Sequence, residues 1–275
     1  ALGCQYDAES ETTCWIGNAQ DDYADAGQVV NYAEIHDNLT LYDKLKASVP
    51  TDDEATTVAR AKLADSVVYL SEGIPAIQLG QEFLRTKGGN GNSYNAGDAA
   101  NAIDWNRAAQ YADSVDYVKG LIKLRKQIKA LRLTNYDDIN DSVTMLKSDE
   151  GVVAYQAKDS SGTYMVIFNA NNEPAAVEGM GAGKYNVLAG DGTVYDENAK
   201  DAFVRKGSTY TAGALSATVL KVASADDVVP VISGMTESTT ITVGSKFDSM
   251  AGVTADDSID GDLTDGIKVE GTVDA

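Results

Sequence analysis

The amino-acid sequence predicts an α/β fold for the first half of the chain and an all-β fold for the rest. In residues 29–132, short apolar runs alternate with segments of helical periodicity, which is typical of strand–helix units in a parallel sheet. From about Ser142 the apolar residues alternate with a period of two and turn residues recur between them, which indicates antiparallel strands. We therefore expect an α/β domain over 1–138, an all-β domain over 139–224 and a small acidic unit over 225–275.

Two apolar runs in the α/β part are expected to be parallel strands. They are Val29–Ile35 and Ile74–Leu79, and each is followed by a helical segment. The polar residues His36, Asp37 and Asn38 come directly after the first run. These three polar side chains are therefore expected at the carboxyl end of that strand. Two strand–helix units do not distinguish an open sheet from a barrel.

One helix is predicted after each of these two strands. Thr51 is expected to cap the first helix, Glu54 to complete a capping box, and Gly73 to end the helix. The second helix follows a long polar loop that runs from Gly80 to about Asp113. Its buried face is expected to carry Val118, Leu121, Ile122, Ile128 and Leu131, and its solvated face Lys119, Lys123, Lys126 and Lys129.

The strands of the all-β part are predicted from alternation. Five lie in the second domain, namely Val143–Leu146, Val152–Gln156, Tyr164–Phe168, Tyr185–Leu188 and Ala217–Val222. Two more, Ile241–Val243 and Ile267–Val269, lie in the last unit. About 45 residues is small for a β-sandwich, so this last unit is expected to be incomplete.

The composition disfavours several classes of partner. A formal net charge of −20 and a pI near 4.3 argue against nucleic acid and anionic membrane surfaces as partners. A neutral sugar as substrate is compatible with this charge. No apolar run approaches the roughly 20 residues needed to cross a bilayer, and no membrane insertion is expected. The chain opens at Ala1 without a secretion signal or a starting methionine, which suggests a piece of a longer protein.

No cofactor or metal site is expected. Cys4 and Cys14 match no zinc-binding spacing and are expected to be unpaired thiols. A calcium site is suggested by four aspartates of the last unit, Asp256, Asp257, Asp260 and Asp262. Position twelve counted from the first of them is Ile267, where an EF-hand needs a bidentate glutamate. A solvated acidic loop is therefore expected, although another geometry for a structural calcium stays open.

Three sequence strings resemble those of one enzyme family, in the same order. Asn31–Leu45 is similar to the fourth conserved sequence region of the α-amylase superfamily in its pullulanase form. Gly73–Lys87 is similar to the last barrel strand of these enzymes and the loop after it, and Asn92–Asn95 followed by Ile103–Trp105 also matches. The chain thus resembles the C-terminal part of a type I pullulanase, most specifically over residues 29–132.

This resemblance implies an architecture and an activity. Val29–Ile35 and Ile74–Leu79 would be the seventh and eighth strands of a (β/α)8 barrel, and the all-β domain would be the family's C-terminal β-sandwich domain. Asp260–Thr264 looks like the start of a bacterial immunoglobulin-like module. The implied activity is hydrolysis of α-1,6-glucosidic bonds in pullulan, starch or glycogen. The implied source is a bacterial protein outside the cell or at its surface.

The resemblance also assigns site residues. Retaining glycosidases use a nucleophilic carboxylate and an acid/base carboxylate. In the family these belong to barrel strands four and five, which no segment here resembles, so the chain alone is expected to be inactive. Asp37 takes the position of a third carboxylate, which stabilises the transition state, and His36 and Asn38 take those of substrate contacts. Further substrate contacts are implied for four residues of the long polar loop after Gly80, which could equally brace that loop: Arg85, Asn92, Tyr94 and Asn95.

Two other functions stay open. Another hydrolase of the α-amylase superfamily, isoamylase-like or acting on α-1,4 bonds, would share these strings. A non-catalytic carbohydrate-binding or cell-surface protein is compatible with residues 142–275, although no aromatic platform is evident there. That second alternative conflicts with the strings found in residues 29–132.

Overall fold

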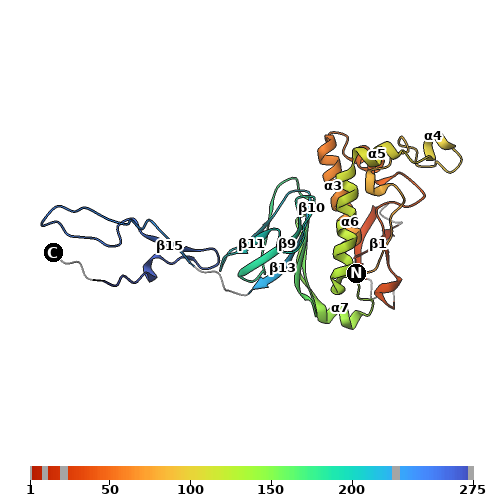
Figure 1. Cartoon of the computed structure of the whole chain (residues 1–275). Coiled ribbons are helices and arrows are strands. Elements are labelled where there is room, and N and C mark those ends of the chain that lie inside the picture. Colours follow the sequence, from red (N-terminus) through yellow and green to blue (C-terminus); the bar gives the residue numbers. More distant parts are fainter. Residues whose placement is uncertain (1, 8–11, 19–23, 225–229, 272–275) are drawn as a thin grey trace.

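The computed structural model describes residues 2–7, 12–18, 24–224 and 230–271, and for the first two segments it describes the backbone alone. A helical part, a β-sheet and an extended tail follow one another (Figure 1). The helices are α2 (Leu41–Ser48), α3 (Glu54–Leu70), α4 (Asp98–Asn101), α5 (Trp105–Gln110), α6 (Ala112–Gln127) and α7 (Tyr136–Ser142). The predicted change from helical to alternating periodicity near Ser142 coincides with the end of α7.

An antiparallel hairpin near the start of the chain was not predicted. It consists of β1 (Leu2–Asp7) and β2 (Thr12–Asn18). The polar sequence there shows no clean alternation, so the pairing is not visible in the periodicity. The prediction of unpaired thiols at Cys4 and Cys14 concerns side chains outside the described part of the chain.

The two strands predicted for the α/β part are neighbours and run parallel. β3 (Val30–Asn31) pairs with β4 (Ile74–Pro75) in a two-stranded sheet. Both are shorter than the predicted strands Val29–Ile35 and Ile74–Leu79. Within the described residues each strand has a single neighbour, and the proline of β4 has no N–H to donate to a ladder, so regular pairing ends early.

The start of α3 differs from the predicted capping box. Asp53 caps the helix instead of Thr51, because its carboxylate accepts a hydrogen bond from the Thr56 N–H (2.8 Å). Glu54 does not complete the box. Its carboxylate accepts a hydrogen bond from the Tyr111 hydroxyl (2.5 Å), which ties the start of α3 to the end of α5.

The end of α3 is set by a buried arginine. The helix ends at Leu70 instead of reaching Gly73. Arg125 of α6 donates to the carbonyls of Tyr69 (2.9 Å), Ser71 (2.7 Å) and Gly73 (2.7 Å). Carbonyls after a helix end need partners from outside the helix, and one guanidinium supplies three of these bonds.

The faces of α6 were predicted correctly, apart from one position. The four lysines are exposed, and Val118, Leu121, Ile128 and Leu131 are buried, whereas Ile122 is half-buried. The regular helix ends at Gln127, and a short 3-10 helix at Lys129–Leu131 follows it. The polar loop after Gly80 contains more structure than predicted, since it holds a 3-10 helix at Gln81–Phe83 and the helices α4 and α5. Helix α2 was not predicted either.

The all-β part is built on one seven-stranded antiparallel sheet. Its order is β10-β9-β13-β7-β6-β5, with β11 also paired to β9, and a separate pair is formed by β8 and β12. The strands are β5 (Val143–Asp149), β6 (Val152–Asp159), β7 (Gly162–Asn169), β8 (Ala175–Val177), β9 (Gly183–Gly190), β10 (Thr193–Val194), β11 (Asp201–Val204), β12 (Tyr210–Ala212) and β13 (Ser216–Ser224). The five predicted strands are present as β5, β6, β7, β9 and β13, and the four shorter ones were not predicted.

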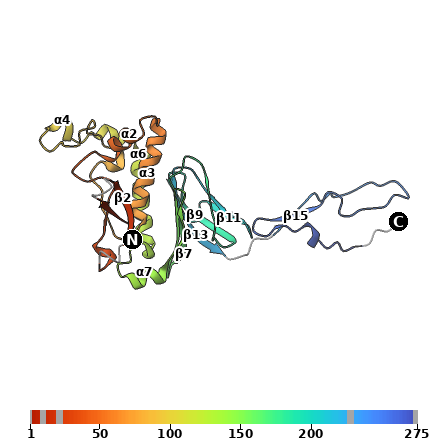
Figure 2. The same ribbon diagram turned by 180° about the vertical axis from the view of Figure 1, so that it is seen from behind.

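Both faces of this sheet are covered. Along β7, Tyr164, Val166 and Phe168 belong to a core shared with α3 and α6, while Met165 and Ile167 belong to a core shared with β8, β11 and β12. Successive side chains of a strand point to opposite faces, so one strand serves both cores. Helices α3 and α6 lie along one face of the sheet in both views (Figure 1 and Figure 2).

The tail forms a small antiparallel sheet from β14 (Val231–Ser233), β15 (Thr254–Asp257) and β16 (Gly261–Asp262). The predicted strands Ile241–Val243 and Ile267–Val269 are wrong. Neither run has a partner strand within residues 230–271, and most of their apolar side chains are exposed. Apolar alternation favours a strand only where a second layer covers it, and the described tail has none over these runs.

Of the four aspartates expected in a solvated acidic loop, Asp256, Asp260 and Asp262 are exposed and Asp257 is not. Asp257 is buried, and its Oδ1 accepts hydrogen bonds from the N–H groups of Ile259 (2.7 Å) and Asp260 (2.9 Å). Asp256 pairs with Arg205 of the sheet domain (2.8 Å). Among the described residues, no three His, Cys, Asp or Glu side chains are grouped as a metal ion would require. None of the described helices has the length and apolar character to span a bilayer.

Candidate functional site

The first loop of the candidate site, residues 32–40, joins β3 to α2. His36 and Asp37 are exposed, with 79% and 77% of their side-chain surfaces accessible, and His36 Nε2 lies 3.3 Å from Asp37 Oδ2. Asn38 has a left-handed backbone (φ 65°) that turns the chain toward the helix. Thr40 then caps α2, its hydroxyl accepting from the Asp43 N–H (3.2 Å). The three predicted side chains therefore lie exposed on a loop that is anchored at both ends.

The second loop of the site, residues 80–104, lies against the first at one point. A Cβ placed on Gly91 would be 3.8 Å from Asn38 Cα and 3.7 Å from Leu39 Cδ2. The predicted contacts Asn92, Tyr94 and Asn95 follow on this loop, and all three are exposed, Tyr94 by 82%. No hydrogen bond among the described residues joins them to the side chains of the first loop. The structure therefore brings the two loops together but does not place these three side chains on His36 or Asp37.

Arg85 differs from the other predicted contacts because it braces the second loop. Its guanidinium donates to the carbonyls of Leu79 (3.3 Å) and Asn101 (2.6 Å). It also lines a cavity of about 400 Å³ together with Phe83 and Arg107. These contacts agree with the alternative that Arg85 braces its loop. A role in substrate binding stays a prediction.

A buried polar network that was not predicted joins helix α2 to the second loop. Asp43 of α2 accepts hydrogen bonds from the Thr86 hydroxyl and from the Lys87 N–H (2.8 Å). Lys87 Nζ donates to the Ser93 hydroxyl (2.9 Å), which in turn donates to Asn101 Oδ1 (3.0 Å). Burial by itself would raise the pKa of the Asp43 carboxyl, but these hydrogen bonds lower it on balance. Asp43 and Lys87 both lie within the family-like strings, where position alone assigned them no role.

Glu34 is a second buried carboxylate of the site. Its Oε2 accepts a hydrogen bond from the Leu41 N–H at the start of α2. Burial raises its pKa, and the Leu41 contact and the positive charges of Arg85, Lys44 and Lys87 oppose this rise. The carboxylate therefore faces both the start of α2 and the cations of the second loop.

Asp65 of α3 lies close to this carboxylate and is also buried. Its Oδ1 accepts a hydrogen bond from Gln81 Nε2 (2.5 Å). Burial raises its pKa to about 7; the bond from Gln81 opposes the rise, and the charges of Glu34 and Glu82 add to it. Asp65 therefore titrates near neutral pH inside the fold.

We expect Asp65→Asn to remove a pH dependence of stability. The folded state holds the Asp65 proton up to about pH 7, whereas the unfolded chain releases it near pH 4, so folding stability falls as pH rises through this window. The wild type should lose about 3 kcal/mol of unfolding free energy between pH 5 and pH 8 because of Asp65. The variant should not show this loss. Urea unfolding at the two pH values measures this loss. An equal difference between wild type and variant at both values would contradict it.

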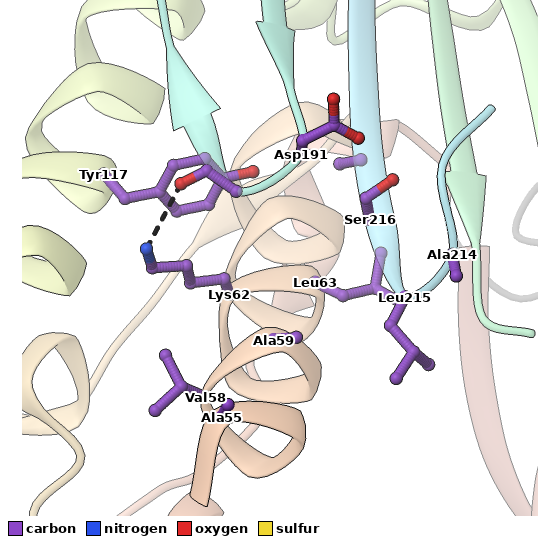
Figure 3. Close-up of a pocket in the computed structure, with 12 residues that line it drawn as sticks. Ala55, Val58, Ala59, Lys62, Leu63, Tyr117, Asp191, Ala214, Leu215 and Ser216 are labelled. Atoms are coloured by element: carbon purple, nitrogen blue, oxygen red, sulfur yellow. Dashed lines mark hydrogen bonds between the residues drawn. The ribbon is translucent and has the colours of Figure 1, made fainter. Parts of the chain in front are cut away.

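A separate pocket of about 300 Å³ lies between α3, α6 and the sheet (Figure 3). Its lining includes Lys62, Tyr117, Asp191 and Ser216. Lys62 Nζ donates to the Gly192 carbonyl (3.2 Å) and lies 5.4 Å from the Tyr117 ring centroid. Its lining residues come from neither site loop, so we do not assign the pocket to the candidate site.

Known proteins similar to this chain are pullulanases and an isoamylase by name. A pullulanase of Bacillus subtilis (strain 168) is 39% identical over 132 residues, which cover 48% of this chain and 18% of that protein. Pullulanase A of Streptococcus pneumoniae serotype 2 is 30% identical over 258 residues, covering 71% of the chain and 20% of that protein. An isoamylase of a Flavobacterium species is 44% identical over 89 residues, covering 32% of the chain and 11% of that protein. No known protein-family profile matches the chain.

Solved structures show the same similarity in three dimensions. A pullulanase from Bacillus acidopullulyticus superposes with a TM-score of 0.69 at 36% identity, over 74% of this chain and 25% of that one. A type I pullulanase from Bacillus subtilis strain 168, complexed with maltose, gives a TM-score of 0.66 at 30% identity, over 73% and 28% of the two chains.

The chain spans about a fifth of the length of the two pullulanase relatives. The solved pullulanases match nearly three quarters of this chain, which itself combines helices with an antiparallel sheet. Over most of its length, the chain is therefore pullulanase-like and resembles the C-terminal part of such a protein.

Proposed function

We propose that the chain is part of an α-glucan debranching glycoside hydrolase that cleaves α-1,6-glucosidic bonds by a retaining mechanism. The observation that carries the proposal is the exposed His36–Asp37–Asn38 loop at the carboxyl end of the parallel strand β3. That location is where α/β barrels hold their catalytic groups. The similarity of the chain to pullulanases supports the same function.

In this proposal Asp37 stabilises the transition state. A retaining glycosidase passes through an oxocarbenium-like transition state, and hydrogen bonds to the sugar hydroxyls that strengthen there lower the barrier. An ionised carboxylate makes stronger hydrogen bonds of this kind than a neutral group. His36 would donate to a hydroxyl of the same glucose unit, and Asn38 would contact the sugar beside it. The nucleophile and the acid/base would come from a part of the polypeptide outside this chain, which would be inactive alone.

We also propose that β3 and β4 are the last two strands of a (β/α)8 barrel. Apolar side chains on and next to this pair are exposed, among them Val30, Ile35, Ile74 and Leu79. Further strands and helices of a barrel would cover such residues, since exposed apolar patches mark surfaces that are covered in the assembled protein. The domain limits 1–138, 139–224 and 225–275, the immunoglobulin-like identity of the tail and a location outside the bacterial cell belong to the same proposal.

The proposed substrates are the α-glucans pullulan, starch and glycogen. Solved pullulanases similar to this chain are complexed with maltose and with maltotetraose, which are short α-glucans. The exposed polar side chains of the two loops, Tyr94 among them, offer hydrogen-bonding groups and an aromatic ring to a neutral sugar.

The test is reducing-sugar release by the chain expressed together with its upstream coding sequence. We expect release from pullulan and no release by the 275-residue chain alone. Release from linear amylose but not from pullulan would keep the superfamily and overturn the debranching function. Retention of the protein on immobilised α-glucan without any turnover would favour the non-catalytic alternative instead.

A second candidate is an isoamylase-like debranching enzyme. It is favoured by the 44% identity to the Flavobacterium isoamylase, which is higher than the identity to either pullulanase although it covers a shorter segment. Assays on glycogen and pullulan side by side separate the two. A marked preference for glycogen would favour the isoamylase-like activity.

A further inference from the structure

Glu34 is buried where its neighbours in the sequence are exposed. Its residue surface is 2% accessible, whereas the side chain of His36, two residues later, is 79% accessible. An ionised carboxylate is costly to bury unless its oxygens are bound. The burial therefore depends on the contacts that the carboxylate makes.

One contact joins the two ends of the first loop. Glu34 Oε2 accepts the N–H of Leu41, the first residue of α2. The first N–H groups of a helix have no acceptor within the helix, and a negative charge is stabilised there by the helix dipole. Residues 35–40, which include the whole His36–Asp37–Asn38 segment, lie between the two bonded residues. This hydrogen bond therefore closes the loop that these residues form.

The same carboxylate faces the second loop. Arg85 and Lys87 contribute favourable charge at Glu34, as does Lys44 of α2, whose Nζ also donates to the Ala33 carbonyl (3.2 Å). The two cations of the second loop are fixed in turn, Arg85 on backbone carbonyls and Lys87 on Ser93. Glu34 thus places a buried carboxyl group at the start of α2, near the cations of the loop that carries the other predicted contacts.

We infer that Glu34 is a positioning residue, which holds the His36–Asp37–Asn38 loop in register with α2. The inference rests on the function proposed above. Asp37 can favour the transition state only if its carboxylate is held within a fraction of an ångström of the sugar hydroxyls. A displacement of about 1 Å can lower a rate about 100-fold.

The first test compares Glu34→Ala and Glu34→Gln in the polypeptide that hydrolyses pullulan. The alanine variant should lower kcat about 100-fold with little change in KM, because a misplaced Asp37 loses contacts made mainly in the transition state. The glutamine variant keeps an acceptor for the Leu41 N–H and should recover to within about tenfold of the wild type.

The control for burial alone is Glu72→Ala. Glu72 is also a buried glutamate (8% exposed), but it lies at the end of α3, and the described residues join it to neither loop by a hydrogen bond. Its truncation should change the melting temperature without changing kcat. Hydrogen exchange of the Leu41 amide in the 275-residue chain gives a readout that needs no activity. The amide should be protected in the wild type and lose that protection in Glu34→Ala.

A second pair of variants applies if Glu34→Ala does not fold. Leu41→Pro deletes the N–H that Glu34 accepts, and proline is well tolerated at the first position of a helix. Thr40, the preceding residue, already has the extended backbone (φ −59°, ψ 159°) that a residue before proline needs. Leu41→Ala removes the same side chain but keeps the N–H. The proline variant should therefore have a kcat at least tenfold below that of the alanine variant.

The outcomes separate this inference from the proposed function. Wild-type kcat in Glu34→Ala, or equal kcat in the two Leu41 variants, would overturn the positioning role even if Asp37→Asn shows its expected loss of kcat. Wild-type kcat in Asp37→Asn would show that the site was placed on the wrong residues, and no release from pullulan by the wild type would overturn the proposed function itself. A kcat loss in Glu72→Ala equal to that in Glu34→Ala would also overturn the inference, since burial alone would then explain both.

Discussion

Asp37→Asn should lower kcat for pullulan about 100-fold in the polypeptide that carries the activity, a loss of about 3 kcal/mol of transition-state stabilisation. The change keeps the size of the side chain and removes its charge, so it weakens the hydrogen bonds that an ionised acceptor makes to sugar hydroxyls. Asp37 is largely exposed, so the substitution should leave the fold unchanged. Initial rates of reducing-sugar release over a range of pullulan concentrations give kcat and KM separately.

The matched control for this prediction is Asp141→Asn. Asp141 is an exposed aspartate of α7, outside both loops, and it undergoes the same chemical change. Its kcat should equal that of the wild type. If Asp37→Asn also kept wild-type kcat, the site would have been placed on the wrong residues.

Arg125→Met should lower the free energy of unfolding by about 3–5 kcal/mol. The buried guanidinium donates to three carbonyls around the end of α3, and methionine leaves all three without that donor. It also removes the cation that faces the buried carboxylate of Glu72. Urea unfolding of the 275-residue chain near pH 8, where the Glu72 carboxylate is mostly ionised, measures the loss.

Two further variants show whether the loss has this origin. Lys119→Met lies on the exposed face of the same helix, where the ion pair with Asp116 is open to solvent, and should change stability by less than about 0.5 kcal/mol. Adding Glu72→Gln to Arg125→Met should recover part of the loss. Burial already raises the pKa of Glu72 to about 7, so its buried charge is costly without Arg125, and glutamine removes that charge. A loss of under 1 kcal/mol in Arg125→Met would contradict the role given to the guanidinium.

Local periodicity accounts for the elements that the sequence predicted well. The five longer strands of the sheet and the exposed lysines of α6 follow from side-chain alternation and helical repeat, which need only neighbouring residues. The same pattern failed in the tail. There the runs at Ile241 and Ile267 have the apolar alternation of strands but no second layer over them in the described residues.

The candidate site was predictable in position but not in its supports. The order of strand and polar residues predicts His36 and Asp37 directly after a strand, and the structure places them, exposed, on the loop that follows the shorter β3. The hydrogen bonds from Thr86 and Lys87 to Asp43 join segments more than forty residues apart, so no local pattern could show them. The roles of the predicted site residues stay predictions.

The sequence by itself determined the order of α3, α6 and the five longer strands of the sheet, the apolar face of α6 and the likeness to pullulanases. The tertiary structure alone decided which acidic residues are buried. Asp37 is exposed, whereas Glu34 and Asp65 are buried against Leu41 and Gln81. The physical reason is that a carboxylate's burial and pKa depend on charges and hydrogen-bond donors from distant segments, which only the folded chain brings together.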